Sequence, residues 1–382
     1  MTDRLYYIDS FIKDFSAVVT SCEAVKGGFE VTLNRSAFFP EGGGQKGDTG
    51  FIGGVAVTDT QERGGEVYHY TARPLAVGET VDCSIDWEQR FRRMQNHSGE
   101  HIVSGIAHTK FGCENVGFHM GADGIIIDFS VYLDRNQVAE LELAANRAIY
   151  ENTSITARFP SDEELKTLEY RSKLELTENV RIVTIEGYDV CACCAPHLRS
   201  TGQVGLIRIY ESQKHKDGVR IRMLAGLDAF EDTLEKARNV EAISNMLSAK
   251  QNETAAAVER LKAENEAFKY ELYGLKRALE QAEIRNLKPT DGNICVFTDS
   301  FETDQLRNVC NAGMELCGGI CAVFAGNDTD GRRYIMGSKT VNMGTEVKKI
   351  NAALNGRGGG RDSMIQGSLK AIEAQIRDFF GV

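Results

Sequence analysis

Two pairs of metal-binding side chains, far apart in the sequence, constrain the fold of this chain most. His97 and His101 are four residues apart in "NHSGEHIV". Cys193 and His197 show the same spacing in "DVCACCAPHLRS". On a helix, residues four apart share one face, which brings the two histidines together, whereas Cys193 and His197 follow a predicted strand. Zinc prefers imidazole and thiolate ligands in a tetrahedral arrangement. The two pairs together supply three histidines and one cysteine, so we expect the fold to bring both segments to one zinc ion.

Alternatives to this ligand set remain at this stage. "HSGEH" also matches the H-x-x-E-H signature of inverted zinc proteases, in which Glu100 would be the general base. Such a protease needs a further carboxylate ligand, and Cys193 and His197 would then have no role. We therefore interpret Glu100 as a carboxylate that faces solvent or substrate. Cys191 and Cys194 lie close by, and either thiol is an alternative to Cys193 as the ligand.

The composition is typical of a soluble protein with more than one domain. The chain has 382 residues, of which 42% are hydrophobic and 26% charged. No run of about 18 apolar residues occurs, and the N-terminus lacks a signal-peptide core, so we expect a cytoplasmic protein without a membrane span. Ten cysteines are then thiols or metal ligands rather than disulfides. The net charge of −11 argues against nucleic acid only mildly, because a local basic strip is compatible with it.

Periodicity predicts an α+β protein with four segments. Residues 1–88 alternate apolar and polar side chains between glycine-rich turns, which indicates a small β-barrel. Residues 89–228 mix helices and strands: a helix capped by Asp86 with both histidines facing inward, further helices near 136–151 and from Ser161, and a hairpin that turns at Asp217-Gly218. This segment is the predicted zinc-containing domain.

The last two segments are a helical linker and a compact C-terminal domain. Residues 229–288 contain a seam with 3-4-3-4 spacing, which predicts a coiled coil: Val258, Leu261, Asn265, Phe268, Leu272, Leu275 and Leu279. This helix is either continuous or broken near "SAKQNET". Residues 289–382 predict an α/β domain in which "NGRGGGRDS" leads into a final helix bearing Ile365, Leu369, Ile372, Ile376 and Phe380. The linker or this domain is the expected contact of a homodimer.

The motifs, taken in order, resemble a known family. "FFPEGGGQKGDTG", "RRMQNHSGEHI" and "DVCACCAPHLRSTGQVG" are similar to the editing domain of alanyl-tRNA synthetase, its second additional domain, and to the freestanding AlaX-type alanyl-tRNA editing proteins. "GRGGGRDSMIQG" resembles the C-terminal domain shared by these synthetases and DHH phosphoesterases. The whole chain therefore resembles a long-form editing protein. One departure is Cys194-Ala195-Pro196, where many relatives have Gly-Gly-Thr.

The resemblance implies particular site residues. It carries zinc binding, one ion per chain, over to His97, His101, Cys193 and His197. It also carries the active-site lining over to Gly42, Gly43, Gly44 and Gln45, and Ser36 is the nearest match to a hydroxyl residue that contacts the substrate. Gln45 is expected to hydrogen-bond the attacking water while backbone N–H groups of the loop receive the oxyanion.

The implied function is trans-editing: zinc-dependent hydrolysis of the ester of serine, with glycine as a second candidate, wrongly attached to alanine tRNA. The zinc either orients the substrate, which we favour because four protein ligands fill a tetrahedron, or activates water. Alternatives are a non-catalytic tRNA-binding protein with structural zinc and a general metallohydrolase. Expected tRNA contacts are Lys214, Lys216, Arg220 and Arg222 in the hairpin, and Arg357 and Arg361 at the start of the predicted final helix.

Overall fold

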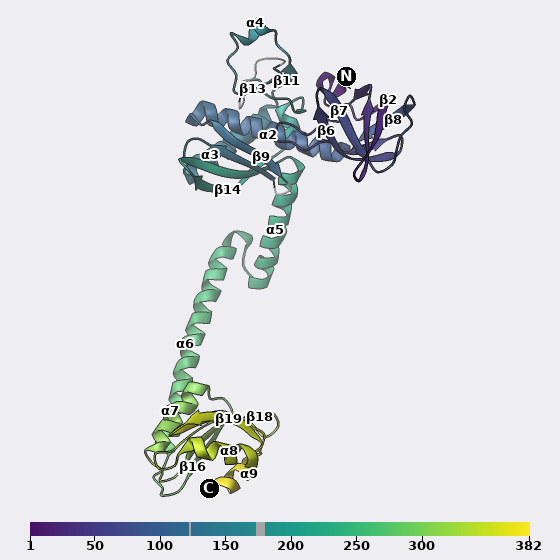
Figure 1. Cartoon of the computed structure of the whole chain (residues 1–382). Coiled ribbons are helices and arrows are strands. Elements are labelled where there is room, and N and C mark those ends of the chain that lie inside the picture. Colours follow the sequence, from purple (N-terminus) through teal and green to yellow (C-terminus); the bar gives the residue numbers. More distant parts are fainter. Residues whose placement is uncertain (122–123, 173–179) are drawn as a thin grey trace. The chain divides into compact units, whose positions relative to one another are not determined.

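The computed structural model describes residues 1–121, 124–172 and 180–382, which form a mixed α+β protein. The chain divides into two compact units, Met1–Ala242 and Ile243–Val382, whose elements are labelled in Figure 1. The predicted boundaries at residues 88 and 228 lie inside the first unit, and the boundary at residue 288 lies inside the second.

The N-terminal part of the first unit is a closed barrel with the strand order β2-β3-β7-β6-β5-β8. Its core consists of alternate residues that point inward, among them Val19, Val31, Leu33, Ile52 and Val81. The strands are β2 (Asp14–Val25), β3 (Gly28–Leu33), β5 (Gly50–Ile52), β6 (Val55–Arg63), β7 (Glu66–Thr71) and β8 (Thr80–Ile85). Outside the barrel lie α1 (Leu5–Ile8) and the paired strands β1 (Asp3–Arg4) and β4 (Arg35–Ser36).

A long helix, α2 (Trp87–Phe111), follows the barrel and forms the centre of the unit. It begins as predicted at Asp86, whose side chain accepts a hydrogen bond from the Gln89 amide, and it ends at Gly112 in the left-handed conformation. All residues from Met94 to Ala107 are buried, because protein surrounds this part of the helix on every side. His97 and His101 are therefore shielded from bulk water.

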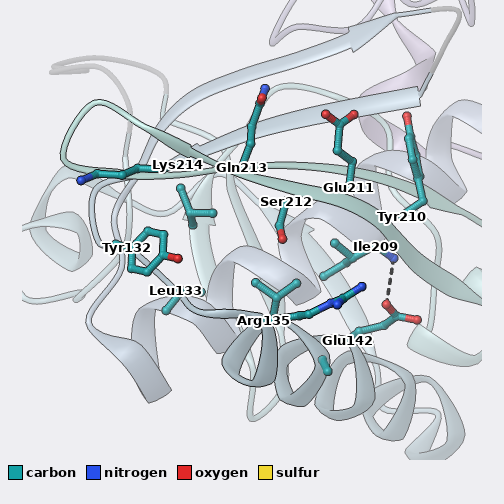
Figure 2. Close-up of a pocket in the computed structure, with 13 residues that line it drawn as sticks. Tyr132, Leu133, Arg135, Glu142, Ile209, Tyr210, Glu211, Ser212, Gln213 and Lys214 are labelled. Atoms are coloured by element: carbon teal, nitrogen blue, oxygen red, sulfur yellow. Dashed lines mark hydrogen bonds between the residues drawn. The ribbon is translucent and has the colours of Figure 1, made fainter.

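Two antiparallel sheets and a second helix surround α2. The four-stranded sheet has the order β14-β15-β10-β9, and the three-stranded sheet has the order β11-β12-β13. Helix α3 begins at a capping box formed by Asp134 and Gln137, and it borders a pocket beside the edge strand β14 (Figure 2). The elements are β9 (Asn115–Gly121), β10 (Gly124–Phe129), α3 (Arg135–Glu151), β11 (Ile155–Arg158), α4 (Asp162–Leu165), β12 (Ile182–Ile185), β13 (Asp189–Ala192), η1 (Thr201–Val204), β14 (Ile207–His215) and β15 (Gly218–Ala225).

The predicted hairpin is present, with its turn one residue earlier than expected. His215 pairs with Gly218, so the two-residue loop consists of Lys216 and Asp217. Lys216 has a φ of 52°, which a two-residue hairpin loop requires at its first position.

The helical segment is broken, as the second alternative predicted. Helix α5 (Leu227–Leu247) ends at Ser248, whose φ is 48°, and η2 (Gln251–Glu253) precedes α6 (Thr254–Asn286). The apolar seam of α6 is exposed: Leu261 is 52% exposed and Phe268 67%. Within the described ranges, neither α6 nor any other helix is long and apolar enough to cross a membrane.

The second unit ends in a five-stranded sheet with the order β16-β17-β18-β20-β19. The predicted strands over "NICVFTDS", "GICAVFAG" and "RRYIMGS" are present, with a helix between the first two. The elements are β16 (Ile294–Thr298), α7 (Thr303–Met314), β17 (Cys321–Asn327), β18 (Gly331–Gly337), α8 (Met343–Ala353), β19 (Gly356–Arg361), β20 (Met364–Leu369) and α9 (Glu373–Phe380).

The prediction that the glycine run leads directly into the final helix is wrong. Residues Gly356–Arg361 form strand β19, and Ile365 and Leu369 lie on β20, paired with Met336 and Arg332. A spacing of four residues is even, so it places two side chains on one face of a strand as well as of a helix. Both residues are buried, which satisfied the apolar pattern without a helix. Only Ile376 and Phe380 are buried residues of α9.

Candidate functional site

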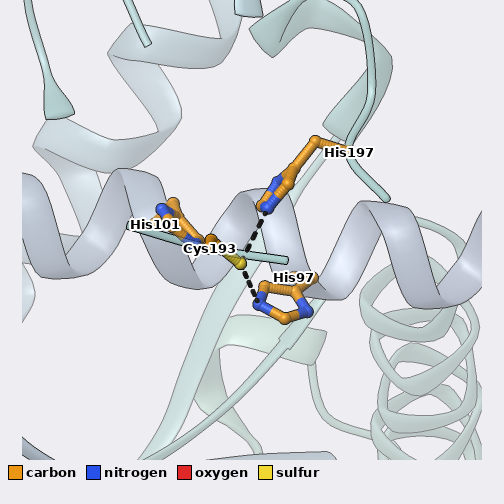
Figure 3. A group of neighbouring side chains, drawn as sticks. All are labelled: His97, His101, Cys193 and His197. Atoms are coloured by element: carbon orange, nitrogen blue, oxygen red, sulfur yellow. Dashed lines mark hydrogen bonds between the residues drawn. The ribbon is translucent and has the colours of Figure 1, made fainter. Parts of the chain in front are cut away.

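Four side chains converge on one point in the first unit (Figure 3). Helix α2 contributes His97 and His101, and the segment after β13 contributes Cys193 and His197. Cys193 Sγ lies 3.5 Å from His97 Nε2 and 3.4 Å from His197 Nε2. One donor atom from each of the four residues lies within 4.8 Å of the others, which is close enough for all four to hold one metal ion.

A second set of contacts fixes the orientation of each imidazole ring. Metal-binding histidines commonly donate the ring N–H that faces away from the ion to a protein oxygen. The Nδ1 atoms have three different partners: Gln45 Oε1 at 3.2 Å from His97, Asp189 Oδ2 at 2.9 Å from His101, and Ser98 Oγ at 3.1 Å from His197. With Nδ1 engaged, Nε2 of each ring is the atom left for an ion.

The electrostatics of the group favour a thiolate. Burial opposes a charge on Cys193, but the imidazoles around it hold the pKa of its thiol well below the ordinary value. Burial lowers the pKa of His197 to about 3, so this ring is neutral at physiological pH. A neutral imidazole and a thiolate are the protonation states that a zinc ion requires. The chemistry of this donor set therefore fits zinc.

Asp189 also orders the surroundings of the site. Its carboxylate accepts hydrogen bonds from Arg171 Nε at 2.7 Å and Nη2 at 2.9 Å, in addition to its contact with His101. Cys191, with His101 and Asp189, forms a second cluster of three potential ligands. Because Arg171 already compensates the charge of this carboxylate, the four-residue group offers the more suitable donors for a metal ion.

The glycine-rich loop lies beside the four donors. Gly42 and Gln45 exchange backbone hydrogen bonds of 3.0 Å across a tight turn, in which Gly43 and Gly44 have φ values of 58° and 80°. A Cβ on Gly44 would lie 2.6 Å from the Phe118 ring, and one on Gly43 would lie 3.3 Å from Cys194 Sγ. Both positions therefore need glycine, for conformation and for space.

Two arginines of α2, Arg90 and Arg93, connect this loop to the helix. The Arg90 side chain is fully buried, forms an ion pair with Asp48 and donates to the Ala37 carbonyl at 2.7 Å. Arg93 donates to the Gly47 carbonyl at 2.8 Å. These contacts connect the barrel to the helix that bears two donors, and the sequence analysis missed them. Arg90 and Arg93, seven and four residues before His97, were the available signal.

The interpretation of Glu100 as a carboxylate that faces solvent is wrong. The residue is only 2% exposed. Its Oε1 accepts hydrogen bonds from Ser104 at 2.7 Å and from Asn115 at 2.5 Å, and its Oε2 lies 3.9 Å from His101 Nε2. This carboxylate connects α2 to β9 beside the metal site.

Ser36 is not among the converging side chains. It is fully buried, and its hydroxyl lies 2.8 Å from His69 Nε2. Since His69 Nδ1 lies 2.9 Å from the Val31 carbonyl, Nδ1 carries the proton and Nε2 accepts from Ser36. The contact with substrate stays a prediction.

The basic side chains predicted to contact tRNA differ in whether they already form ion pairs within the protein. Arg220 forms a two-point ion pair with Asp128, at 2.6 and 2.8 Å, and Arg222 Nε lies 3.1 Å from Glu211 Oε2. Lys214 has no acidic partner within the described ranges. Arg357 and Arg361 lie on strand β19 rather than at a helix start, so the N-terminal N–H groups expected beside them are elsewhere. Their binding role stays a prediction.

Three segments of the chain match models of protein families. Residues 6–89 match the class II (A) tRNA synthetases, residues 180–222 match the second additional domain of threonyl and alanyl tRNA synthetases, and residues 291–380 match the DHHA1 domain. These segments are therefore similar to parts of class II synthetases, and the segment with Cys193 and His197 lies within the match to their second additional domain.

Comparison with curated proteins narrows this class. The chain is 28% identical to alanyl-tRNA editing protein AlaX-L of Pyrococcus horikoshii, over 99% of this chain and 97% of that protein. It is 25% identical to alanyl-tRNA editing protein Aarsd1 of Rattus norvegicus, over 97% of this chain and 96% of that protein. The predicted resemblance to long-form alanyl-tRNA editing proteins is confirmed over nearly the full length.

Alanine–tRNA ligases match as well, over a smaller part of their length. The ligase of Halobacterium salinarum is 32% identical over 92% of this chain, and that of Ignicoccus hospitalis is 29% identical over 94%. The chain spans 40% of the length of each of these ligases.

Proposed function

We propose that this protein is a cytoplasmic trans-editing enzyme, which hydrolyses the ester bond of serine or glycine wrongly attached to alanine tRNA. One observation carries the proposal: three imidazole Nε2 atoms and the Cys193 thiol converge beside the loop that contains Gln45. The similarity to two proteins named alanyl-tRNA editing proteins supports it.

The four converging residues are the proposed ligands of one zinc ion per chain. Bound there, zinc supplies positive charge that orients the amino group or the terminal ribose of the substrate. Four protein ligands fill a tetrahedron, which favours orientation over activation of water. Cys193 is the proposed thiolate ligand, and the three partners at Nδ1 keep the rings in position.

Residues of the glycine-rich loop are the proposed catalytic groups. Gln45 is 1% exposed; its Oε1 contacts His97, while its Nε2 has no hydrogen-bond partner among the described residues. This N–H group can donate to the attacking water or to the ester oxygen. Gly43 and Gly44 are exposed, so their backbone N–H groups can stabilise the oxyanion that forms at the ester carbon.

The proposed selectivity follows from the cost of unpaired polar groups. A site whose polar atoms bond the serine hydroxyl leaves those atoms unpaired when alanine enters, and discrimination on this basis is strong. Ser36 stays a candidate for this contact, although its hydroxyl is bonded to His69 here. A substrate hydroxyl would have to replace that bond.

Two basic surfaces are proposed to bind the tRNA. Lys214 is one candidate in the hairpin, where Arg220 and Arg222 would first have to leave Asp128 and Glu211. In the second unit, Arg357 pairs with Ser368, which pairs with Arg333, so the two arginines share one face of the sheet. Arg361 lies on the same face, because it is four residues after Arg357 on β19 and alternate residues of a strand share a face. Such a cluster suits phosphate groups.

A homodimer formed through α6 is part of the proposal. The seam residues of α6 are about half exposed, and a second copy of the helix would cover them with the same 3-4-3-4 pattern.

A second candidate function is a tRNA-binding protein without catalytic activity, whose zinc is structural. The closed set of four ligands favours it, because structural zinc sites typically have no open position.

One deacylation assay separates these functions. Alanine tRNA charged with serine, glycine or alanine is incubated with the protein, and release of each amino acid is measured. Release of serine or glycine while the alanyl ester persists supports editing. Binding of all three without release supports the tRNA-binding alternative. A Cys193→Ser variant that stays folded, loses zinc and keeps the full rate would overturn the zinc-dependent part.

A further inference from the structure

A pocket of about 560 Å³ lies between helix α3 and the edge strand β14 (Figure 2). None of its lining residues belongs to the metal-binding group or to the glycine-rich loop. The floor is apolar, since it includes the buried side chains of Leu133, Val138 and Val219. Tyr132, which is 52% exposed, forms a side wall.

The pocket carries an excess of positive charge, because its acidic residues already have basic or backbone partners. Both oxygens of Glu142 are engaged, one by Arg208 Nε at 3.0 Å and the other by the Ile209 amide at 3.1 Å. Glu211 is engaged by Arg222 at 3.1 Å. Internal partners therefore already compensate both acidic residues that line the pocket.

The two cations that line the pocket have no such compensation. Arg135 and Lys214 have no acidic partner anywhere in residues 1–121, 124–172 and 180–382, and they extend from α3 and β14 respectively (Figure 2). Two uncompensated cations beside an apolar floor favour a ligand that is anionic and has a flat, weakly polar body. A nucleotide has both properties, because its phosphate is charged and its base has a stacking face.

We propose that this pocket binds one nucleotide of RNA, with the base against Tyr132 and the phosphates between Arg135 and Lys214. The inference rests on the proposed function, because it assigns the RNA to the bound tRNA. It adds a contact distant from the reacting ester. Ile207 at the start of β14 packs on α2 at Gly99, between the two histidines, and Lys214 lies about 23 Å farther along the strand. The nucleotide is therefore an internal one and not the 3′-terminal adenosine.

The test uses the full chain, loaded with zinc, and fluorescently labelled alanine tRNA. We expect Tyr132→Ala to weaken binding about tenfold through lost stacking, and Tyr132→Phe to restore it. The double variant R135A/K214A should make the slope of log K against log salt shallower by about 1.5, as expected for two lost phosphate contacts. Tyr150→Ala and Arg147→Ala are matched controls, because both residues are exposed on α3 outside the pocket and should change neither value.

Kinetics distinguish failure of the pocket from failure of the editing function. On seryl-tRNA, the pocket variants should raise KM with kcat unchanged. On the seryl ester of adenosine, which is too short to reach the pocket, they should match the wild type. If the variants bind tRNA with wild-type affinity and salt dependence, the proposal that the pocket binds a nucleotide is wrong. The pocket beside β14 would then be a surface for a protein partner. A wild-type protein that neither binds tRNA nor hydrolyses either ester overturns both proposals.

Discussion

The side-chain oxygen of Gln45 lies 3.2 Å from Nδ1 of His97, which links the glycine-rich loop directly to the metal-binding group. If a metal ion were bound at Nε2, Nδ1 would carry the proton and would donate a hydrogen bond to Gln45 Oε1. Gln45 therefore orients a ligand through its oxygen, while its amide N–H faces no protein acceptor among the described residues.

Replacement of Gln45 tests this link. We expect Gln45→Ala to reduce zinc affinity about 10- to 100-fold, because the imidazole of His97 loses the acceptor that fixes its orientation. Competition with a chelator of known affinity measures the change without reference to activity. Gln251→Ala, at an exposed position of η2, is the control and should bind zinc as the wild type does. Equal affinity of the wild type and Gln45→Ala would show that this contact does not support the metal site.

The four converging side chains were predictable in part from spacing, because His97 and His101 are four apart on a predicted helix, whereas Cys193 and His197 were recognised as metal-ligand residue types that follow a predicted strand. His97 and His101 lie on α2 as expected, and Cys193 and His197 meet them. The partners of the ligands were not predictable in the same way. Gln45, Asp189 and Ser98 come from three different segments, and only the tertiary fold brings each of them to its histidine.

Two errors have a common physical origin. The final helix was predicted from apolar residues four apart, a spacing that β20 satisfies equally well. Glu100 was interpreted as facing solvent or substrate, but it is buried, and Ser104 and Asn115 donate the hydrogen bonds that offset the cost of burying its carboxylate. Local pattern alone does not distinguish these cases, since both depend on which partners the fold supplies.

Asp189 is predicted to support both the metal site and the fold. Burial opposes its charge, yet hydrogen bonds from His101 and Arg171 hold the pKa of this carboxyl below the ordinary value. We expect Asp189→Asn to lower the free energy of unfolding by about 3 kcal/mol, because it leaves Arg171 as an uncompensated charge in a buried position. Zinc affinity should fall as well, about 10-fold or more, because His101 loses a charged acceptor.

An exposed ion pair provides the control for Asp189. Asp9 pairs with Arg199 at 2.8 Å, but the two side chains are 38% and 62% exposed. Asp9→Asn should therefore cost less than about 1 kcal/mol. Urea unfolding of the zinc-loaded proteins measures both changes, and equal losses in the two variants would contradict the predicted difference.

His69 predicts how stability depends on pH. Burial lowers the pKa of His69 to about 4 from an ordinary value of 6.5, opposed by its hydrogen bond to the Val31 carbonyl and by the charge of Glu66. Between pH 6.5 and 4 the unfolded chain binds a proton that the folded protein does not, so stability falls as the pH falls. The loss from this residue is about 3 kcal/mol at pH 4 and absent above pH 7.

The variant His69→Gln isolates this contribution, because glutamine keeps a hydrogen-bonding side chain near Ser36 and does not titrate. Unfolding by urea at pH 7, 5.5 and 4, with zinc present throughout, measures the difference between the variant and the wild type. We expect the variant to lose less stability on acidification. Parallel pH profiles for the two proteins would show that His69 is already protonated in the folded state or does not titrate in this range.

The apolar seam of α6 predicts a dimer, and we expect two substitutions in the seam to dissociate it into monomers. Leu272 and Leu275 are 53% and 58% exposed, so covering what is exposed is favourable by about 1 kcal/mol per side chain. We expect the wild type to have twice the mass of one chain in light scattering, and Leu272→Ser combined with Leu275→Ser to have the mass of a monomer. Tyr270→Ser is the matched control, since Tyr270 is 81% exposed on the same helix but lies outside the 3-4-3-4 positions. Dissociation by Tyr270→Ser alone, or a monomeric wild type, would contradict a dimer formed through this seam.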